Sequence, residues 1–190
     1  MDSRPNFKVI LTSRGPIVVV ETLDEGLFLD MLGGLVRGAF GGHPQPLFRW
    51  SVTEGLRRLE YRGYDSAGIA VGDGSTLKVI KRTGKIKALS AAVPEGLNGG
   101  YGIGHTRWAT HGEVNDLNAH PHVDKSGKIA ICHNGIIENY LALREKLACE
   151  GYEFITETDS EVIAHLIAYN YKGDLVTAVQ ASIPLLKGTY

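Results

Sequence analysis

Tyr101-Gly102-Ile103-Gly104-His105-Thr106-Arg107-Trp108-Ala109-Thr110-His111-Gly112-Glu113 is one of two segments in which an apolar run ends in a dense set of polar side chains. The other segment reads Lys128-Ile129-Ala130-Ile131-Cys132-His133-Asn134-Gly135-Ile136-Ile137-Glu138-Asn139. Their apolar runs, Tyr101–Gly104 and Lys128–Cys132, have the character of buried strands. Polar residues at the ends of buried strands commonly line a site, because the sheet positions them and the loop exposes them.

Two groups in these segments have the chemistry of a ligand site. Arg107 offers a planar fork of N–H donors that suits a carboxylate. Asn134 and Gly135 offer a side-chain amide and a backbone N–H that a ligand can approach closely, which is what an oxyanion hole requires. A glycine-rich turn and a buried arginine–acid pair would explain either segment alone. Their occurrence together favours a site.

Composition limits the class of protein. The chain has 190 residues, of which 43% are hydrophobic and 22% charged, with a formal net charge of -1. This length allows one globular domain with a real core, and the charge balance favours neither nucleic acid nor an acidic membrane surface as a partner. Cys132 and Cys149 are too few for a disulfide framework. Without a membrane-length apolar run or a signal-peptide pattern, we expect a cytoplasmic protein.

The patterning changes at about residue 50. Residues 1–50 form an atypical segment, in which Val9–Leu11 and Ile17–Val20 predict two strands joined at a turn over Ser13–Pro16. Residues 51–190 have the regular patterning of one domain in which helix layers pack on sheets, an α+β class.

Within residues 51–190 we expect strands over 66–71, 77–81 and 152–156, and helices between and after them. Capping boxes at Ser51–Glu54 and at Thr158-Asp159-Ser160-Glu161 predict two helix starts. The remaining helices are expected over 85–92, from an Asn139 cap to Gly151, from the second capping box to about Tyr171, and over 175–186 with Pro184 bending the last turn.

Four motifs occur in one order along the chain. They are Tyr61-Arg62-Gly63-Tyr64-Asp65-Ser66-Ala67-Gly68, His105-Thr106-Arg107-Trp108-Ala109-Thr110-His111-Gly112, His133-Asn134-Gly135-Ile136-Ile137-Glu138-Asn139 and Glu157-Thr158-Asp159-Ser160-Glu161-Val162-Ile163-Ala164-His165-Leu166. Together they resemble a known family, the glutaminase (class II glutamine amidotransferase) domain of glutamine–fructose-6-phosphate aminotransferase (isomerising). The resemblance runs from about Glu54 to Tyr190. Related phosphoribosyl and asparagine-forming amidotransferases look different at the first two motifs, so the sugar-phosphate branch is favoured.

The resemblance implies a fold and a reaction. The fold is the four-layer α-β-β-α sandwich of the N-terminal-nucleophile (Ntn) hydrolases, which we expect to be incomplete on its C-terminal side here. The reaction is hydrolysis of L-glutamine, whose ammonia converts fructose 6-phosphate to glucosamine 6-phosphate in amino-sugar biosynthesis. A sugar-isomerase domain, absent from this chain, would be the partner that holds fructose 6-phosphate. We expect no cofactor.

The resemblance also implies roles for single residues. Arg107 would hold the α-carboxylate of glutamine, Asp159 its α-ammonium group, and Thr110 and His111 would line the same wall. Simple stabilisation of a helix dipole would explain Asp159 about as well.

Three further residues have implied roles in the reaction. Trp108 would be an aromatic gate toward the ammonia exit, although a tryptophan is more often a core residue. Asn134 and Gly135 would stabilise the oxyanion.

The nucleophile of the family has no counterpart in this sequence. Members of the family begin with a cysteine whose own α-amino group serves as the base. An ungapped register places that position at Arg37, and arginine is always protonated and cannot attack a carbonyl. Cys132 is interpreted as a buried strand residue, and Cys149, on a helix, is a still weaker candidate. We therefore expect impaired catalysis.

Several alternatives stay open. Clustered histidines could indicate a metal, but their spacings fit no zinc pattern, so we expect no metal site. Residues 1–21 could be a circular rearrangement that supplies strands which normally follow Tyr190, or the product of chance or of a reading-frame error. The chain could be an impaired glutaminase domain, a glutamine-binding module without chemistry, or a non-functional fragment.

Overall fold

A computed structural model describes residues 8–10, 18–20, 56–57, 59–73, 75–97, 99, 101–109 and 112–190. Several expectations fall outside these residues. They are the capping box at Ser51–Glu54, the turn at Ser13–Pro16, the site residues Thr110 and His111, and the nucleophile position Arg37.

The largest sheet is antiparallel with the order β4-β3-β5. It comprises β3 (Ser66–Gly72), β4 (Leu77–Thr83) and β5 (Tyr101–Arg107), so the strands expected at 66–71, 77–81 and 101–104 are confirmed and somewhat longer. The hairpin between β3 and β4 is stabilised by Asp73, whose carboxylate accepts hydrogen bonds from the backbone N–H groups of Ser75 and Thr76 at 2.8 Å each. This sheet carries two of the four motifs on neighbouring strands.

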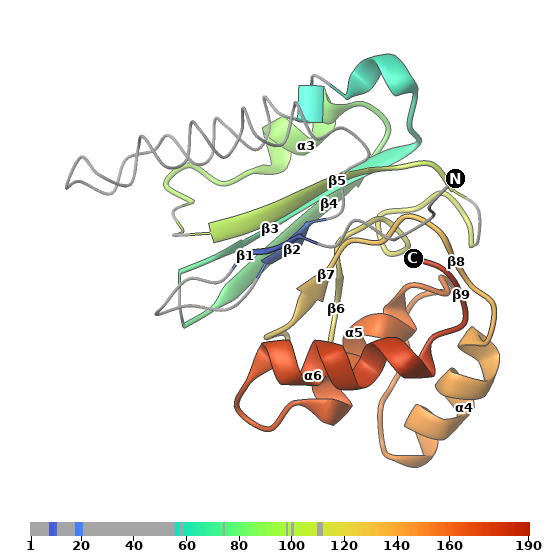
Figure 1. The fold of residues 1–190 in the computed structure, drawn as a ribbon. Coiled ribbons are helices and arrows are strands. Elements are labelled where there is room, and N and C mark those ends of the chain that lie inside the picture. Colours follow the sequence, from blue (N-terminus) through green and yellow to red (C-terminus); the bar gives the residue numbers. More distant parts are fainter. Residues whose placement is uncertain are drawn as a thin grey trace.

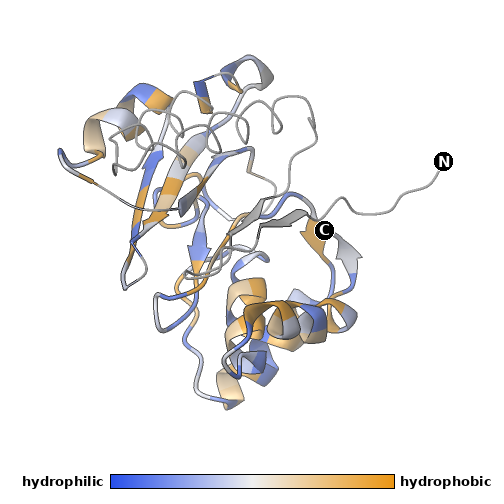
Figure 2. Cartoon of the chain, turned by 60° about the vertical axis from the view of Figure 1, so that its left-hand side comes forward, coloured by the Kyte–Doolittle hydropathy of each residue, from blue (hydrophilic) through white to orange (hydrophobic). Residues whose placement is uncertain are grey.

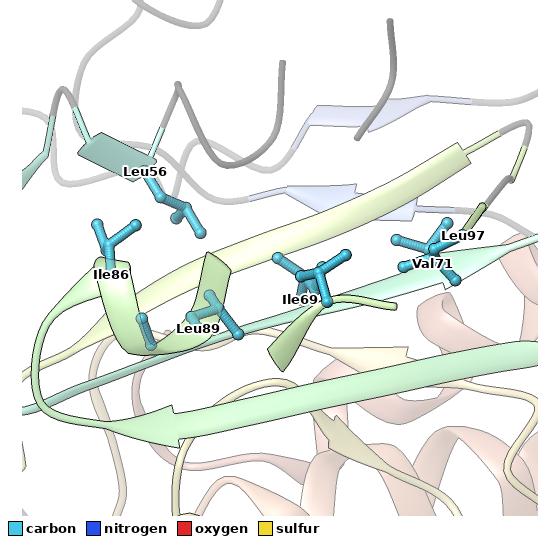
Figure 3. Close-up of a cluster of buried hydrophobic side chains, with 8 residues drawn as sticks. Leu56, Ile69, Val71, Ile86, Leu89 and Leu97 are labelled. Atoms are coloured by element: carbon cyan, nitrogen blue, oxygen red, sulfur yellow. The ribbon is translucent and has the colours of Figure 1, made fainter. Parts of the chain in front are cut away.

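The outer face of this sheet buries an apolar core beneath α3 (Ile86–Ala92). Ala67, Ile69 and Val71 alternate along β3 and point to this face, as a period of two requires. They pack against Ile86 and Leu89, and the cluster also includes Leu56, Val93 and Leu97 (Figure 3). Burial of these side chains holds the helix on the sheet.

The inner face of the sheet is closely approached by backbone from the next layer. Gly68 lies directly opposite His105 in the β3–β5 register. A Cβ atom built on Gly68 would lie 2.2 Å from the carbonyl oxygen of His120, so no other residue fits there without moving the backbone. Glycine at this position therefore lets the second layer pack directly on the sheet.

The second layer is made of short antiparallel pairs. β6 (His122–Val123) pairs with β7 (Ala130–Ile131), and β8 (Ile136–Ile137) pairs with β9 (Gly188–Thr189).

The two strands expected near the N-terminus are confirmed as β1 (Lys8–Ile10) and β2 (Val18–Val20), which pair antiparallel, and β2 lies against β5 and β7 (Figure 1). The proposed rearrangement of residues 1–21 stays a prediction.

Helices cover the second layer on the side away from the large sheet. They are α4 (Tyr140–Cys149), α5 (Glu161–Asn170), α6 (Leu175–Ser182) and the short 3-10 helix η2 (Ile183–Leu185), which contains Pro184. One apolar cluster joins Ile131 of β7 to α5 and α6, and another joins Ile137 of β8 to α4 and α5. Figure 2 shows the apolar positions of these helices in orange. The layers therefore follow the order helix, sheet, sheet, helix (Figure 1).

Three local expectations are wrong. No strand forms over Tyr152–Thr156. Asn139 directly precedes α4 but makes no side-chain capping bond, and the helix after the second capping box begins at Glu161, with Ser160 and not Thr158 as its N-cap. The Asn139 amide instead accepts from Lys187 N and donates to the Leu185 carbonyl, at 2.9 Å each. Tertiary partners have replaced the local caps.

A second capping group also has tertiary partners. The carboxylate of Glu161 accepts from the backbone N–H groups of Ile155 and Thr156, at 3.0 and 2.9 Å, and not from the start of its own helix. These bonds replace the strand expected over Tyr152–Thr156.

Within the part of the chain that the structure describes, none of the helices has the length and apolar character that crossing a bilayer requires.

Candidate functional site

Arg107 is the last residue of β5, on the inner face of the large sheet. The residue is 3% exposed, and it lies opposite Ser66 in the register. Its Nη1 donates to the carbonyl oxygen of Glu113 at 3.2 Å and lies 3.8 Å from Oδ1 of Asp65. The guanidinium is thus fixed at the point where the strand becomes a loop.

Asp65 holds this end of the sheet together, a role that the sequence analysis missed. Its carboxylate accepts hydrogen bonds from the backbone N–H of Ala109 and, at 2.7 Å, from the hydroxyl of Ser66. Because the same carboxylate faces Arg107, it orients both the guanidinium and the backbone after Trp108. The position of Asp65 within the first of the four motifs was the signal that could have indicated this role.

The loop His133–Ile137 is held on two sides. On one side, Nε2 of His105 lies 2.8 Å from Oδ1 of Asn134, which joins the loop to β5. On the other side, the backbone N–H of Ile137 donates to Oδ2 of Asp159 at 2.7 Å. His105 and Arg107 share the inner face of β5. The structure therefore places Asn134 beside the strand that carries Arg107, and places its loop beside Asp159.

Gly135 adopts a backbone conformation that only glycine adopts readily. Its φ is 146°, and a Cβ atom there would lie 2.1 Å from the carbonyl oxygen of Thr189. The next residue, Ile136, donates its N–H to the hydroxyl oxygen of Thr189 at 3.1 Å. The C-terminal strand thus packs against the back of the loop, which shapes the loop tightly.

Asp159 does more than stabilise a helix dipole. It is 3% exposed and lies just outside α5, whose N-cap is Ser160. One carboxylate oxygen binds the loop N–H of Ile137, and Ser160 Oγ donates weakly to the other at 3.4 Å. Ser160 Oγ also lies 2.9 Å from Nδ1 of His133. The start of α5 therefore contacts the loop at both of the loop's ends.

A second network joins the arginine side of the site to the aspartate side. Glu113, whose carbonyl binds Arg107, donates its N–H to Oε2 of Glu157 at 3.0 Å. Asn118 is 1% exposed and bridges the same two residues with bonds of 3.0 to 3.1 Å. Glu157 precedes Asp159 by two residues. Hydrogen bonds therefore connect the loop that follows Arg107 to the loop that precedes Asp159.

Trp108 is 71% exposed, so the alternative that it is a core residue is wrong. Its ring lies over Gly63, where an added Cβ would be 3.1 Å from Cζ3. A role as a gate stays a prediction.

Four histidines lie buried between the sheet and the helical layer: His105, His120, His122 and His133. The ring centroids of His105 and His120 are 4.4 Å apart, and so are those of His120 and His122. Burial lowers the pKa of His105 to about 4 and that of His122 to about 3, and it holds the pKa of His120 well below its usual value. Burial disfavours the charged imidazolium, so these three rings are neutral at pH 7.

Neither cysteine has the environment of a nucleophile. Cys132 directly follows β7 and is partly buried, and desolvation raises the pKa of its thiol far above the usual value. Cys149 is exposed at the last position of α4. A reactive thiol needs a lowered pKa. Among the described residues, no group of three or more His, Cys, Asp or Glu side chains is arranged to hold a metal ion.

A family model and curated relatives match this chain. The model, described as a glutamine amidotransferase domain, matches residues 105–189. Glutamine–fructose-6-phosphate aminotransferases (isomerizing) from Thermus thermophilus and Aquifex aeolicus are each 56% identical over 140 residues, which are 73% of this chain and 23% and 24% of those proteins. The protein of that name from Clostridium tetani is 52% identical over the same length. The chain thus spans about a quarter of the length of these relatives.

Solved structures agree with the layered architecture. A glutamine phosphoribosylpyrophosphate amidotransferase from B. subtilis, complexed with ADP and GMP, superimposes with a TM-score of 0.60 at 33% identity. A structure described as the allosteric regulatory enzyme of purine biosynthesis gives a TM-score of 0.61 at 33% identity. Each match covers 72% of this chain and 30% of the other. The expected fold, an incomplete four-layer sandwich of the Ntn-hydrolase type, is confirmed.

We expect the free energy of unfolding to fall as the pH falls from 7.5 to 5.5. In the unfolded chain histidine titrates near pH 6.5, whereas burial depresses the folded-state pKa values of His105, His120 and His122. This stability is therefore fully present above pH 6.5 and is lost below it, because the unfolded chain then binds protons that the folded chain does not. The loss approaches about 1.4 kcal/mol per pH unit for each such histidine.

Urea unfolding midpoints at pH 7.5, 6.5 and 5.5 check this expectation. His122→Gln keeps a hydrogen-bonding group near the Thr158 hydroxyl, which lies 3.1 Å from His122 Nε2, but cannot titrate. This variant should reduce the pH dependence of the free energy of unfolding by about the contribution of one histidine. Midpoints that do not change with pH, or an unchanged slope in the variant, would contradict the account.

Proposed function

We propose that this chain, which belongs to the glutamine amidotransferase family and carries a glutaminase domain of the glutamine–fructose-6-phosphate aminotransferase type, binds free L-glutamine between Arg107, Asn134 and Asp159. Arg107 takes the α-carboxylate and Asp159 the α-ammonium group, a pairing that recognises both ends of a free amino acid. The side-chain amide of the ligand then lies against Asn134 and Gly135.

The observation that carries this proposal is the position of the loop His133–Ile137. One of its residues is bonded to His105, two positions from Arg107 on the same strand face, and another is bonded to Asp159. A guanidinium has five N–H donors, so Arg107 can keep its partners and still donate to a ligand carboxylate. Asp159 uses Oδ2 for the loop, and Oδ1 has further lone pairs with which to accept from an ammonium group.

The proposed role in metabolism is the supply of ammonia for amino-sugar synthesis. A sugar-isomerase domain would receive the ammonia and combine it with fructose 6-phosphate to form glucosamine 6-phosphate. Trp108, which is exposed and directly follows Arg107 at the end of β5, would serve as the gate toward such a partner. Thr110 and His111, which follow Trp108 by two and three residues in the sequence, would line the same wall of the proposed glutamine pocket.

A second candidate is a glutamine-binding module without hydrolysis. The position that aligns with the family's nucleophile is Arg37, and neither Cys132 nor Cys149 has a suitable environment. A pocket that binds the amino acid can persist when the nucleophile is lost, because recognition and attack use different side chains. A non-functional fragment would neither bind nor hydrolyse glutamine.

We expect L-glutamine to raise the thermal unfolding midpoint of the unaltered chain. A ligand that binds only the folded state at a hundredfold excess over its Kd contributes about 2.7 kcal/mol, which is roughly 5–10 °C for a domain of this size. Asp159→Asn keeps an oxygen for the N–H of Ile137 but loses the charge that faces the ammonium group, so it should lose most of the shift.

Differential scanning fluorimetry with each variant compared to its own unliganded midpoint measures this effect. The matched control is Asp73→Asn, at the opposite end of the sheet from Arg107, which should keep the full shift. Absence of a shift in the unaltered chain would refute the proposed binding. A full shift in Asp159→Asn would remove that residue from the site.

We expect glutamine hydrolysis to be recovered in a chain that begins at residue 37 with Arg37→Cys. A terminal cysteine supplies both the thiolate and the α-amine base. An enzyme-coupled assay of ammonia release at pH 7.5 measures it, and the same truncation with Arg37 retained is the control, which should release none. A variant that folds and binds glutamine but releases no ammonia would show that Arg37 is not the nucleophile position.

A further inference from the structure

His105 is bonded to the candidate oxyanion-binding side chain. Its Nε2 lies 2.8 Å from Oδ1 of Asn134. Asn134 is exposed although His105 is buried, and among the described residues none accepts a hydrogen bond from the Nδ2 group of Asn134. An amide that is anchored through its oxygen presents its nitrogen on the opposite side.

The protonation state of His105 follows from its partners. An amide oxygen only accepts hydrogen bonds, so the pairing of Nε2 with Oδ1 of Asn134 requires the proton on Nε2. Nδ1 of the ring is buried, and no described residue bonds to it. A second proton on Nδ1 would therefore be buried without an acceptor, which is costly. Burial, together with the nearby His133 and Arg107, lowers the pKa of His105 to about 4, so the ring is a neutral donor at pH 7.

The ring is also held in place by packing. It packs against His120 in a tilted arrangement with 4.4 Å between ring centroids, and His120 packs edge-on against His122 at the same separation. His120 accepts a 3.4 Å hydrogen bond from the backbone N–H of His133. Gly68, which lies opposite His105, lets the backbone of His120 approach the inner face of the large sheet. The Nε2–H group of His105 therefore lies on a strand of the large sheet, and packing against His120, which itself packs against His122, holds its ring in place.

We propose that His105 is a positioning residue that donates its Nε2–H to Oδ1 of Asn134 and so turns the amide nitrogen of Asn134 toward the carbonyl oxygen of the bound ligand. This inference rests on the proposed binding of glutamine. With the amide rotated by half a turn, Oδ1 would face the ligand carbonyl, and two acceptors would repel one another. His105 selects between these two orientations without touching the ligand.

The test compares two ligands and two variants of the full chain. L-Glutamine has the side-chain amide carbonyl, whereas L-norvaline has the same α-carboxylate and α-ammonium groups without it. His105→Leu removes the Nε2–H donor and leaves an apolar side chain in the buried position between the large sheet and His120. His105→Gln keeps an N–H group that can reach Oδ1 of Asn134. Calorimetric titration gives the Kd of each ligand for each chain.

We expect His105→Leu to weaken L-glutamine binding by about tenfold, the size of one lost hydrogen bond of this kind, and to leave L-norvaline binding unchanged. His105→Gln should restore most of the preference for glutamine. A merely structural role would weaken both ligands equally, and that result would overturn the positioning role alone. If the unaltered chain binds neither ligand, the proposed function fails, and this inference fails with it.

Nitrogen NMR of the histidine rings gives an independent readout without ligand. The proposal requires the Nε2–H tautomer of His105 at pH 7, with a proton signal that is protected by the bond to Asn134 and is lost in Asn134→Ala. A predominant Nδ1–H tautomer would mean that the amide donates to the ring, and it would overturn the proposal.

Discussion

The site depends on how the loop His133–Ile137 is held between β5 and the start of α5. One hydrogen bond from His105 to Asn134 and one from Ile137 to Asp159 join elements that are far apart in the sequence. Thr189 packs behind the loop so closely that only glycine fits at position 135. Loop residues placed by such rigid neighbours can present an amide donor with little reorganisation, which is the condition for stabilising a developing negative charge.

The seam between the two β layers makes this arrangement possible. Gly68 admits the backbone of His120 to the inner face of the large sheet, and the buried histidines fill the space beside it. Hydrogen bonds in such a desolvated seam are strong and neutral imidazoles are favoured, because burial disfavours the charged form. The same burial that orients Asn134 through His105 also makes the domain sensitive to acid. Stability and site geometry thus share one set of side chains.

Sequence patterning was sufficient for most elements and for the α+β class, whereas the four-layer sandwich came from the family resemblance. The apolar run at 101–104 predicted the strand β5, and the apolar spacing along the chain predicted α5 and α6, because burial leaves a direct trace in the sequence. The strand expected over 152–156, the cap at Asn139 and the capping box that begins at Thr158 were wrong. Glu161 binds the backbone N–H groups of Ile155 and Thr156, and the amide of Asn139 binds Leu185 and Lys187. The candidate residues came from the family resemblance. The roles of Asp65, Asn118 and His105 escaped prediction, since each depends on partners from another part of the chain.

The central claim is that Arg107, Asn134 and Asp159 face one bound amino acid. A crystal structure of the chain with L-glutamine tests it most directly. The account predicts the α-carboxylate within hydrogen-bonding distance of the Arg107 guanidinium, the α-ammonium group at Asp159, and the side-chain carbonyl oxygen at Nδ2 of Asn134. Glutamine bound elsewhere, or bound here with Arg107 and Asp159 contacting only their own protein partners, would contradict the account.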